Sequence, residues 1–577
     1  MISLDQLNRA AAPEFVAALA AIFEHSPWVA ERVAGLRPFK SGIALHNAMS
    51  DAVMQAPADL QMALILAHPE LAGRAAQRGE LTFASSGEQK RAGLDALTHE
   101  QLERLTTLNV QYRERFGFPF ILAVKGHTPD SVIAALGERV AHDAVQERGV
   151  ALFEICRIAR FRLADLIEEP CGDAILAMLE DLAAFSESDD ALTCSYLTPA
   201  HRATAARIRE FMLAAGLTVH IDAVGNVVGR LRGSDASSRC VLTGSHYDTV
   251  INAGKYDGRL GIVLPIVVAA KLRRSGVHLR YPLEIIAFAE EEGVRFKSTF
   301  LGSRAVAGRF DFNVLDSTDA QGLTLRQVIA DAGLDVAQIS AAARDPRLVA
   351  CFVEVHIEQG PVLLDAGVPV GIVTSIAGSR RSIVTVQGES GHAGTVPMPL
   401  RRDAAAAAAE MVLAVEKRCG AEAGLVGTVG RLEVPGGAIN VIPGRCEFSI
   451  DIRSGDDALR DAAHRDIGAQ MEHIARRRGV SVDRLEVLEA GSVPCSARLQ
   501  DAWALSVQRV TADTARRLPS GAGHDAMMMA SLTDIGMLFV RCGNGGISHN
   551  PQETLSAPDA QIAAQVFEDF LRHNSFE

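Results

Sequence analysis

The chain has 577 residues, and at about 100–200 residues per domain this length predicts three or four domains. A net charge of −13 argues against a nucleic-acid partner. No apolar run approaches the roughly 20 residues that span a bilayer, and the N-terminus lacks a secretory signal pattern. We therefore expect a cytoplasmic protein that binds neither nucleic acid nor a membrane.

Two local features fit this expectation. The nine cysteines are scattered without a C-x-x-C pair, which predicts small core residues in a reducing compartment rather than a metal site. The basic run "RRR" at 476–478 is predicted to be a solvated helix end.

Residues 1–166 are predicted to form an all-α domain. Apolar positions recur every three or four residues, and alternating β-branched runs are scarce, as in "EFVAALAAIF" and "LQMALILA". The pattern restarts around "EEPCGD", so 167–174 is predicted to be a linker.

An α/β pattern follows, in which short β-rich runs such as "CVLTGSHYDTV" and "LEIIAFAEEEG" alternate with helices. Between 378 and 491 the pattern changes to four or so strands with two helices, one of them capped by Asp403. The α/β pattern then resumes. The expected fold is multidomain, with an α/β domain at 175–377 and 492–577 that carries an inserted α+β domain at 378–491.

Polar residues at strand ends mark the α/β part. His246 and His356 end apolar runs, Asp257 lies in a Gly-flanked turn, and His549 follows the run "MLFVRC". Ligands of open α/β sheets lie at such strand ends, and imidazoles with carboxylates suit Zn²⁺ or Mn²⁺. Each residue alone has a simpler explanation as a hydrogen-bonded histidine or a turn aspartate. Their joint occurrence favours a metal site, in which Asp248 would orient His246.

Glu290, Glu291 and Glu292 follow a strand as three consecutive like charges. Such a cluster at the end of a buried strand needs a compensating cation. The motifs H-E-x-x-H, G-x-S-x-G and the P-loop are all absent.

The motifs "GSHYDTV", "AEEEGVRF", "VEVHIEQG", "GESGHAGTVPM" and "GISHNP" resemble, in this order, those of the M20-type binuclear metallohydrolases. The similarity covers about 175–577 and is to the branch of allantoate amidohydrolases, N-carbamoyl-L-amino-acid hydrolases and β-ureidopropionases. It implies two Mn²⁺ or Zn²⁺ ions per subunit, a general base at Glu291, and a homodimer formed through the inserted lid domain. The implied metal ligands are His246, Asp257 as the bridge, Glu292, His356 and His549.

The same resemblance implies a set of residues that hold a ureido acid: Gln359, His392, Asn440, Arg453, Gly523 and His524. His392 would stabilise an oxyanion, reaching across the dimer. Arg453 could grip a carboxylate bidentately, although a surface pair with Asp451 would also explain it. Tyr247 departs from the pattern, since relatives commonly carry an aliphatic residue there, and it could alter packing beside a ligand.

From its residues alone, the helical domain gives weak functional signals. Ser85-x-x-Glu88 and Ser86-x-x-Gln89 read as capping boxes, and His68 before Pro69 could end a helix. Arg162 would ordinarily lie on a solvated helix face.

The stretches "LAHPEL", "SSGEQ" and "RFGFPFI" nevertheless resemble the OHCU decarboxylases, which convert 2-oxo-4-hydroxy-4-carboxy-5-ureidoimidazoline to (S)-allantoin without a cofactor. The resemblance makes His68 the acid/base and Glu88 the residue that positions the substrate hydroxyl. It places the following residues around the substrate: Pro69, Ser85, Gln89, Phe120, Ile121 and Arg162.

Together the two resemblances imply a bifunctional enzyme of urate breakdown. The helical domain would form allantoin, and the C-terminal part would hydrolyse allantoate, two steps downstream, to ureidoglycine or ureidoglycolate with release of ammonia and CO₂. One alternative is an N-carbamoyl-L-amino-acid hydrolase or β-ureidopropionase with the helical domain as a docking or oligomerisation module. Another is a catalytically dead C-terminal binding module, against which the complete ligand set speaks.

Overall fold

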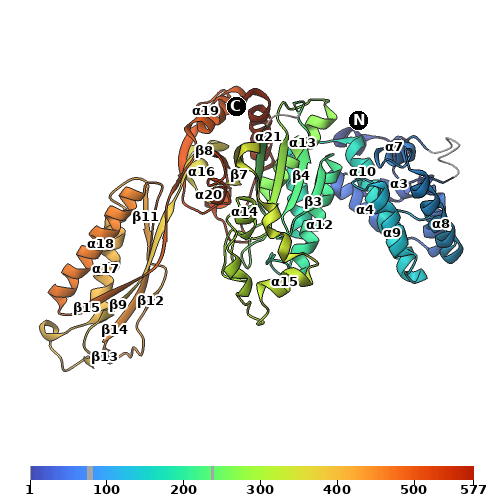
Figure 1. Ribbon diagram of the computed structural model, residues 1–577. Coiled ribbons are helices and arrows are strands. Elements are labelled where there is room, and N and C mark those ends of the chain that lie inside the picture. Colours follow the sequence, from blue (N-terminus) through green and yellow to red (C-terminus); the bar gives the residue numbers. More distant parts are fainter. Residues whose placement is uncertain (1, 74–81, 236–238, 577) are drawn as a thin grey trace.

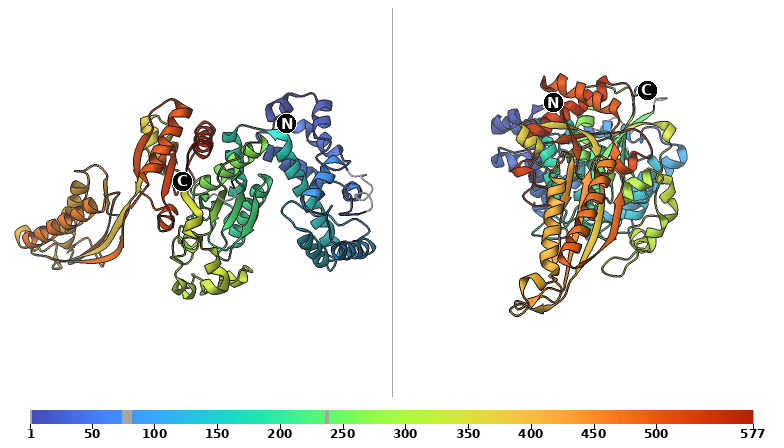
Figure 2. Two further views of the ribbon diagram at one scale, coloured as in Figure 1. Left: turned by 45° about the horizontal axis from the view of Figure 1, so that its top comes forward. Right: turned by 90° about the vertical axis from the view of Figure 1, so that its left-hand side faces the viewer.

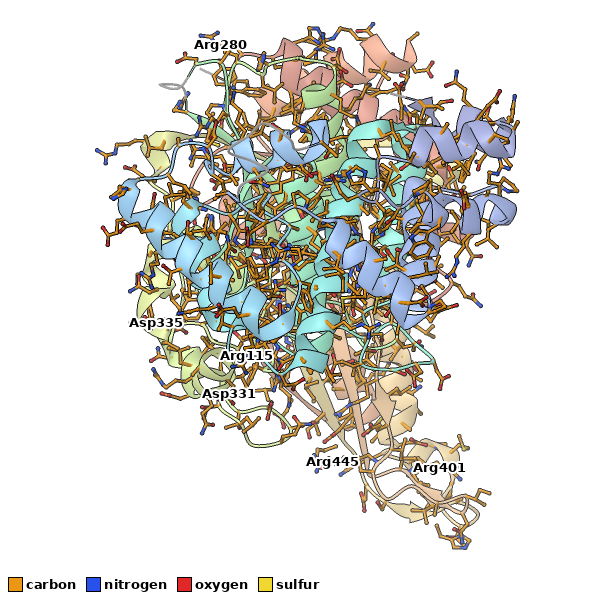
Figure 3. All side chains as sticks on the ribbon, turned by 90° about the vertical axis from the view of Figure 1, so that its right-hand side faces the viewer. Arg115, Arg280, Asp331, Asp335, Arg401 and Arg445 are labelled. Carbon is orange, nitrogen blue, oxygen red and sulfur yellow. The ribbon has the colours of Figure 1, made fainter. Side chains whose placement is uncertain are left out.

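The computed structural model describes residues 2–73, 82–235 and 239–576. The helical part, the α/β part and a projecting α+β unit follow one another across the molecule (Figure 1). The projecting unit extends well beyond the rest in the view of Figure 3, where Arg401 and Arg445 mark it. Among the described helices, none is long and apolar enough to cross a membrane.

The first part is helical, as predicted. Its helices bury one contiguous apolar core, and the short strands β1 (Ile2–Ser3) and β2 (Ile167–Glu168) pair in parallel where this part begins and ends. The helices are α1 (Leu4–Arg9), α2 (Ala12–Leu19), α3 (Trp28–Val33), α4 (Gly42–Met54), α5 (Ala58–Ala67), α7 (Phe83–Arg91), α8 (His99–Phe116), α9 (Pro129–Arg139) and α10 (Ala144–Leu166).

The second part is built on a nine-stranded mixed sheet of order β16-β8-β18-β7-β5-β6-β4-β3, with β17 paired to β8. Strands β18, β7, β5 and β6 are parallel neighbours, so their carboxyl ends meet at one edge. The strands are β3 (Thr218–Ile221), β4 (Val227–Leu231), β5 (Cys240–His246), β6 (Leu283–Phe288), β7 (Val349–Ile357), β8 (Val370–Ile376), β16 (Val493–Pro494), β17 (Arg516–Ser520) and β18 (Ile535–Val540).

Helices cover both faces of this sheet. One face packs against the longer helices α11 (Cys171–Ala183), α12 (Pro199–Ala214), α13 (Leu260–Arg274), α19 (Ala497–Thr511) and α21 (Ala557–His573). The other packs against α14 (Leu301–Val306), α16 (Val362–Ala366) and α20 (Ala526–Met529), and α15 (Leu325–Asp331) lies at the periphery. Strands buried on both faces explain the continuous apolar runs in the sequence.

The projecting unit is a five-stranded antiparallel sheet whose two helices cover one face (Figure 2, right). Sequence analysis did not identify its edge strand β15. The strands are β9 (Gly378–Gln387), β11 (Leu425–Thr428), β12 (Leu432–Glu433), β14 (Arg445–Ser454) and β15 (Ser481–Ala490); the helices are α17 (Ala404–Cys419) and α18 (Asp457–Arg478). Near its tip β10 (Gly391–His392) pairs with β13 (Val441–Ile442).

Several local predictions are confirmed. Asp403 caps α17 by accepting from the Ala406 amide, and the "RRR" run ends α18 with Arg476 well exposed. All nine cysteines are buried and free. A correction concerns α7: Thr82, not Ser85 or Ser86, is the N-cap, so the capping-box reading is wrong. The helix begins three residues earlier, which leaves the Ser85 side chain free for other contacts.

Candidate active sites

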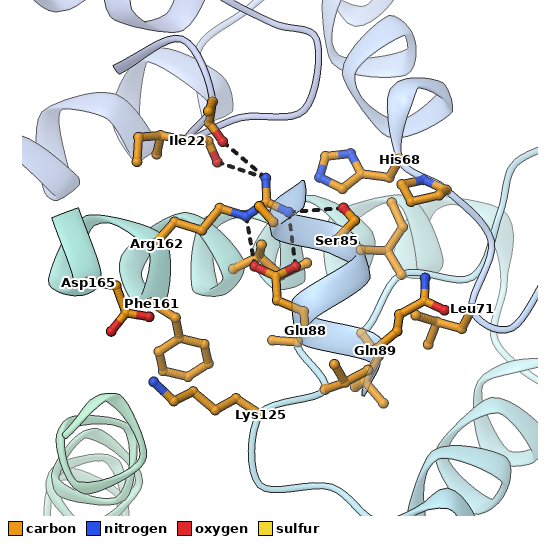
Figure 4. A pocket seen from close by; sticks show the side chains of 18 of the residues that line it. Ile22, His68, Leu71, Ser85, Glu88, Gln89, Lys125, Phe161, Arg162 and Asp165 are labelled. Atoms are coloured by element: carbon orange, nitrogen blue, oxygen red, sulfur yellow. Dashed lines mark hydrogen bonds and ion pairs between the residues drawn. The ribbon is translucent and has the colours of Figure 1, made fainter. Parts of the chain in front are cut away.

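A cavity of about 340 Å³ in the helical part brings together residues from five segments (Figure 4). The residues at the end of α2, the C-terminal end of α5, helix α7, the segment 120–125 and helix α10 all reach it. All eight residues predicted for this site line the cavity: His68, Pro69, Ser85, Glu88, Gln89, Phe120, Ile121 and Arg162.

Arg162 lies between two carboxylates in this cavity and is not on a solvated helix face. Its Nε and Nη2 donate to Glu88 at 2.8 and 2.9 Å, and its Nη1 donates to Glu24 at 2.9 Å. Further donors reach the Ser85 hydroxyl at 3.2 Å and the Ala21 carbonyl. Because its donors are bound by protein groups, the guanidinium supports Glu88 and Ser85 instead of standing open for a substrate carboxylate (Figure 4).

Glu24 was not identified from the sequence, although it completes this network. It is 3% exposed and accepts hydrogen bonds from Thr82, Ser85 and Arg162. These contacts, chiefly the hydroxyl of Thr82 and the charge of Arg162, hold the pKa of Glu24 below its usual range despite burial. No motif flags this residue, because its partners lie 58 or more positions away.

His68 ends α5 before Pro69, as its sequence context suggested. Its Nδ1 lies 2.9 Å from the Leu64 carbonyl, which can only accept, so Nδ1 carries the proton and Nε2 keeps its lone pair. Burial lowers the pKa of His68 to about 4. The ring is therefore neutral at pH 7 and able to accept a proton in the cavity.

The second site lies where the parallel strands end, as predicted. It is a cavity of about 290 Å³ between the α/β sheet and the base of the projecting unit. Asp257 is at its centre: its Oδ1 is 3.6 Å from His246 Nε2 and 3.2 Å from His356 Nε2, and its Oδ2 is 3.1 Å from His549 Nε2. The two oxygens of one carboxylate thus face different imidazoles, which is the geometry of a bridge between two cations.

These side chains form two groups that could each hold a metal ion and that share Asp257. One group is His246, Asp257 and His356; the other is Asp257, Glu292 and His549. The five residues fit two divalent cations, because Asp257 Oδ1 is buried without a hydrogen bond from any residue that the structure describes and the donors are imidazole nitrogens and carboxylate oxygens. Other combinations, with Glu291 or with Glu354 and His524, also satisfy the distances.

The three consecutive glutamates differ in their surroundings. Glu291 and Glu292 line the cavity, and their backbone amides donate to the carboxylate of Asp248, each at 3.1 Å. Glu290 does not line the cavity and is fully buried, and neither of its carboxylate oxygens accepts a hydrogen bond from a described residue. Burial and the neighbouring carboxylates raise the pKa of all three, that of Glu292 to about 7, before any metal charge acts on them.

The predicted orienting role of Asp248 is realised mainly through its backbone. His246 Nδ1 is 3.1 Å from the Asp248 carbonyl and 3.5 Å from its carboxylate, so Nε2 points toward Asp257. The carboxylate of Asp248 instead fixes the turn that carries the glutamates.

The predicted substrate residues of this site separate into two sets. Gln359, Arg453 and Gly523 line the cavity, and Gln359 donates to Asp257 at 2.8 Å. Arg453 also pairs with Asp451 at 2.9 Å, so it both lines the cavity and forms the ion pair that was the alternative explanation for it. His524 is buried behind the cavity wall, within 2.8 Å of Ser520 and packed on His356.

His392 and Asn440 do not reach this cavity. Both are exposed on the projecting unit, where the Ala393 amide donates to the Asn440 carbonyl at 3.0 Å. Strand pairing places His392 opposite Val441, away from the base of the unit. Within one protomer the predicted ureido-acid site is therefore incomplete.

Sequence analysis missed the residues that hold the central aspartate. Glu553 accepts from the amides of Tyr256 and Asp257, and Ser548 donates to both Asp257 and Glu553. Ser548 lies within "GISHNP" and Glu553 follows it two residues later, so the only signal was their nearness to His549.

Tyr247 is fully buried beside His246. Its hydroxyl donates to the Gly225 carbonyl at 2.7 Å, and its ring stacks on His201 with centroids 4.3 Å apart. Tyr247 is therefore accommodated by a hydrogen bond to Gly225 and by stacking on His201.

Comparisons with known proteins agree with this division. Residues 8–164 match the family model "OHCU decarboxylase", and residues 241–573 match "Peptidase family M20/M25/M40". Allantoate deiminase 2 of Glycine max is 39% identical over 71% of this chain and 91% of its own length. An N-carbamoyl-L-amino acid amidohydrolase of Geobacillus stearothermophilus is 41% identical over 62% of this chain and 87% of its own length. The crystal structure of an amidase of the hydantoinase/carbamoylase family from Burkholderia multivorans is 30% identical, with a TM-score of 0.65, over 69% of this chain and 97% of its own.

Proposed function

The chain belongs to peptidase family M20/M25/M40, with an OHCU decarboxylase domain ahead of the family region, and from this premise we propose that it catalyses two reactions of one pathway. The helical part, 1–166, decarboxylates OHCU to (S)-allantoin. The part formed by 175–377 and 492–577 hydrolyses allantoate to ureidoglycine, from which ureidoglycolate can form, with release of ammonia and CO₂. The observation that carries the proposal is that each predicted set of reacting residues surrounds its own cavity.

For the hydrolysis, two divalent ions, Mn²⁺ or Zn²⁺, would be held by the five residues centred on Asp257, and when bound they polarise the ureido carbonyl and acidify water. Glu291 takes the proton from the attacking water, because its side chain lines the cavity and is not needed by either group of three around Asp257. The same carboxyl can then protonate the leaving nitrogen. Gln359 Oε1 accepts no hydrogen bond from the described part of the chain and would accept one from a substrate N–H.

For the decarboxylation, the neutral Nε2 of His68 takes the proton of the substrate hydroxyl. The bond to the departing carboxylate breaks as CO₂, and its electron pair enters the π system of the ring. His68 then returns the proton to carbon, and the ring nitrogen that carries the remaining negative charge takes a second proton from water. Arg162 holds the carboxylate of Glu88 through two hydrogen bonds, and Glu88 positions the substrate hydroxyl. No metal or organic cofactor is needed for this step.

Allantoate is favoured over other ureido acids because of the helical part. N-carbamoyl amino acids and β-ureidopropionate have no chemical link to a decarboxylase that forms allantoin, whereas allantoate is two steps downstream of OHCU. The alternative, an N-carbamoyl-L-amino-acid hydrolase with a non-catalytic helical module, is supported by the 41% identity to the Geobacillus relative.

The inserted unit, 378–491, acts in this proposal as a lid and as a dimer contact. Its open sheet face exposes apolar side chains of the two edge strands β11 and β15: Val426, Leu485 and Val487. A homodimer through this face would carry His392 and Asn440 of one protomer toward the cavity of its partner, which would complete the site. Sedimentation that shows an active monomer would contradict this role.

A substrate panel tests both activities. Purified protein reconstituted with Mn²⁺ or Zn²⁺ should release ammonia from allantoate and accelerate decay of freshly generated OHCU. Turnover of N-carbamoyl amino acids without turnover of allantoate would favour the alternative for the C-terminal part. OHCU decay at the uncatalysed rate would reduce the helical part to a structural module.

A further inference from the structure

The wall of the first cavity is attached to the second part of the chain. Six consecutive residues, 120–125, line this cavity, together with Phe161 and Asp165 on α10. Figure 4 shows Lys125, Phe161 and Asp165 together at one end of the cavity, away from His68. This end is also where the helical part meets α12 and α13 of the α/β part.

The apolar contact is made by Leu213 near the end of α12. Its side chain is 2% exposed and forms one buried cluster with Ala123 and Phe161, two residues that line the cavity. The segment runs so close that a Cβ at Gly126 would lie 2.5 Å from Leu213 Cδ2. Leu213 therefore fixes the distance between α12 and the cavity wall.

Polar contacts close the same junction. Lys125 Nζ donates to the Ala214 carbonyl at 3.1 Å, at the carboxyl end of α12 where cations are stabilised. Arg273 of α13 donates to Asp165 at 2.6 Å and to the same carbonyl at 3.3 Å. Two residues that line the first cavity are thus bonded to the other part of the chain.

A third connection runs through buried charges. The Ala123 amide donates to Glu154 at 2.8 Å, Glu154 accepts from Arg157 at 2.8 Å, and Arg157 donates to Glu210 of α12 at 3.1 Å. Glu154 is 6% exposed, so loss of Arg157 from this series of contacts would leave a buried carboxylate without its cation. The series fixes the position of the Ala123 backbone relative to α12.

From these contacts we propose that α12 of the metallohydrolase part is a structural wall of the decarboxylase cavity and that Leu213 is a positioning residue for decarboxylation. This inference rests on the proposed function of the helical part. The segment 120–125 contacts the substrate, whereas Leu213, Glu210 and Ala214 act through it. The helical part is in this sense incomplete without residues that belong to the second enzyme.

The test uses the full chain and measures both reactions. Leu213→Ala should lower kcat/KM for OHCU decarboxylation about tenfold and leave allantoate hydrolysis within twofold of the unchanged protein. The matched control is Leu499→Ala, which truncates an equally buried leucine on α19, at the far side of the α/β part. Equal effects of the two substitutions on decarboxylation, or none from Leu213→Ala, would overturn the inference.

A second pair of variants separates positioning from general packing. Lys125→Met should raise KM for OHCU more than it lowers kcat, and Lys125→Arg should recover most of the loss, because an arginine can still donate to the Ala214 carbonyl. An unchanged KM in Lys125→Met, or no recovery of KM in Lys125→Arg, would count against a role for the hydrogen bond from Lys125 to the Ala214 carbonyl.

Hydrogen exchange distinguishes failure of this inference from failure of the proposed function. In Leu213→Ala, but not in Leu499→Ala, the Ala123 amide should exchange at least several-fold faster. If the unchanged chain shows no decarboxylation while exchange at Ala123 accelerates as expected, the proposed function is wrong and the coupling stands. Unchanged exchange overturns the coupling whatever the activity.

Discussion

In the helical cavity, Glu24 and Glu88 both face the guanidinium of Arg162, whereas among the described residues Asp257 and Glu292 of the other cavity are ion-paired only with histidines. In the first cavity, an arginine of the chain pairs with both carboxylates. In the second, Asp257 Oδ1 accepts no hydrogen bond from any described residue. A buried carboxylate that the chain does not pair with a cation of its own indicates that a metal ion binds there. A carboxylate paired with an arginine indicates a reaction that needs no metal ion.

Removal of metal should produce the largest difference between the two activities. After exhaustive chelation we expect hydrolysis of allantoate to fall below about 1% of that of the reconstituted protein, since the cation supplies the polarising charge. Decarboxylation of OHCU should stay within twofold, because Arg162 and His68 belong to the chain. Ammonia release and OHCU decay, followed in one sample, measure both. Loss of both activities on chelation would show that the two sites do not differ in this way.

Glu291→Gln should lower hydrolysis about 10²–10⁴-fold, the range for loss of a general base, while metal content by atomic absorption stays near that of the unchanged protein. Glu290→Gln is the matched control, because Glu290 is fully buried and does not line the cavity. We expect it to cost less than about tenfold. If the two variants lost activity equally, the proton acceptor could not be assigned to Glu291.

His68→Ala should lower decarboxylation about 10²–10³-fold and leave hydrolysis unchanged. The pH dependence sharpens this expectation. With its pKa near 4, His68 stays neutral as pH falls from 7.5 to 5.5, so kcat/KM should remain within about twofold over this interval. A histidine with the ordinary pKa would be mostly protonated at pH 5.5 and would lose roughly tenfold. A tenfold decline, after subtraction of spontaneous decay at each pH, would contradict the assignment of a buried neutral base.

The sequence predicts the second site better than the first, because strand ends are visible in the sequence and ion pairs between distant residues are not. The grouping of the candidate metal ligands was predictable because His246, the glutamates and His356 follow or end parallel strands, and parallel strands bring their carboxyl ends to one edge. The fully engaged state of Arg162 was not, because it depends on Glu24, 138 positions away. The separation of His392 from the cavity was not predictable either, since it depends on how far the inserted unit projects. The strand β15 was missed because its exposed face alternates without a clear apolar pattern.

The smallest predicted effect concerns Tyr247, which tests whether the second site also depends on a hydrogen-bonded side chain of the protein. Tyr247→Phe removes the hydroxyl that donates to the Gly225 carbonyl and leaves that buried acceptor unpaired, at a cost of about 1–2 kcal/mol. We expect the thermal midpoint of the α/β part to fall by about 2–4 °C per kcal/mol. Hydrolysis should change less than about threefold, because His246 is oriented by the Asp248 carbonyl and not by its neighbour. A loss above tenfold would mean that the second site, like the first, depends on a hydrogen-bonded side chain of this protein to hold its reacting groups in place.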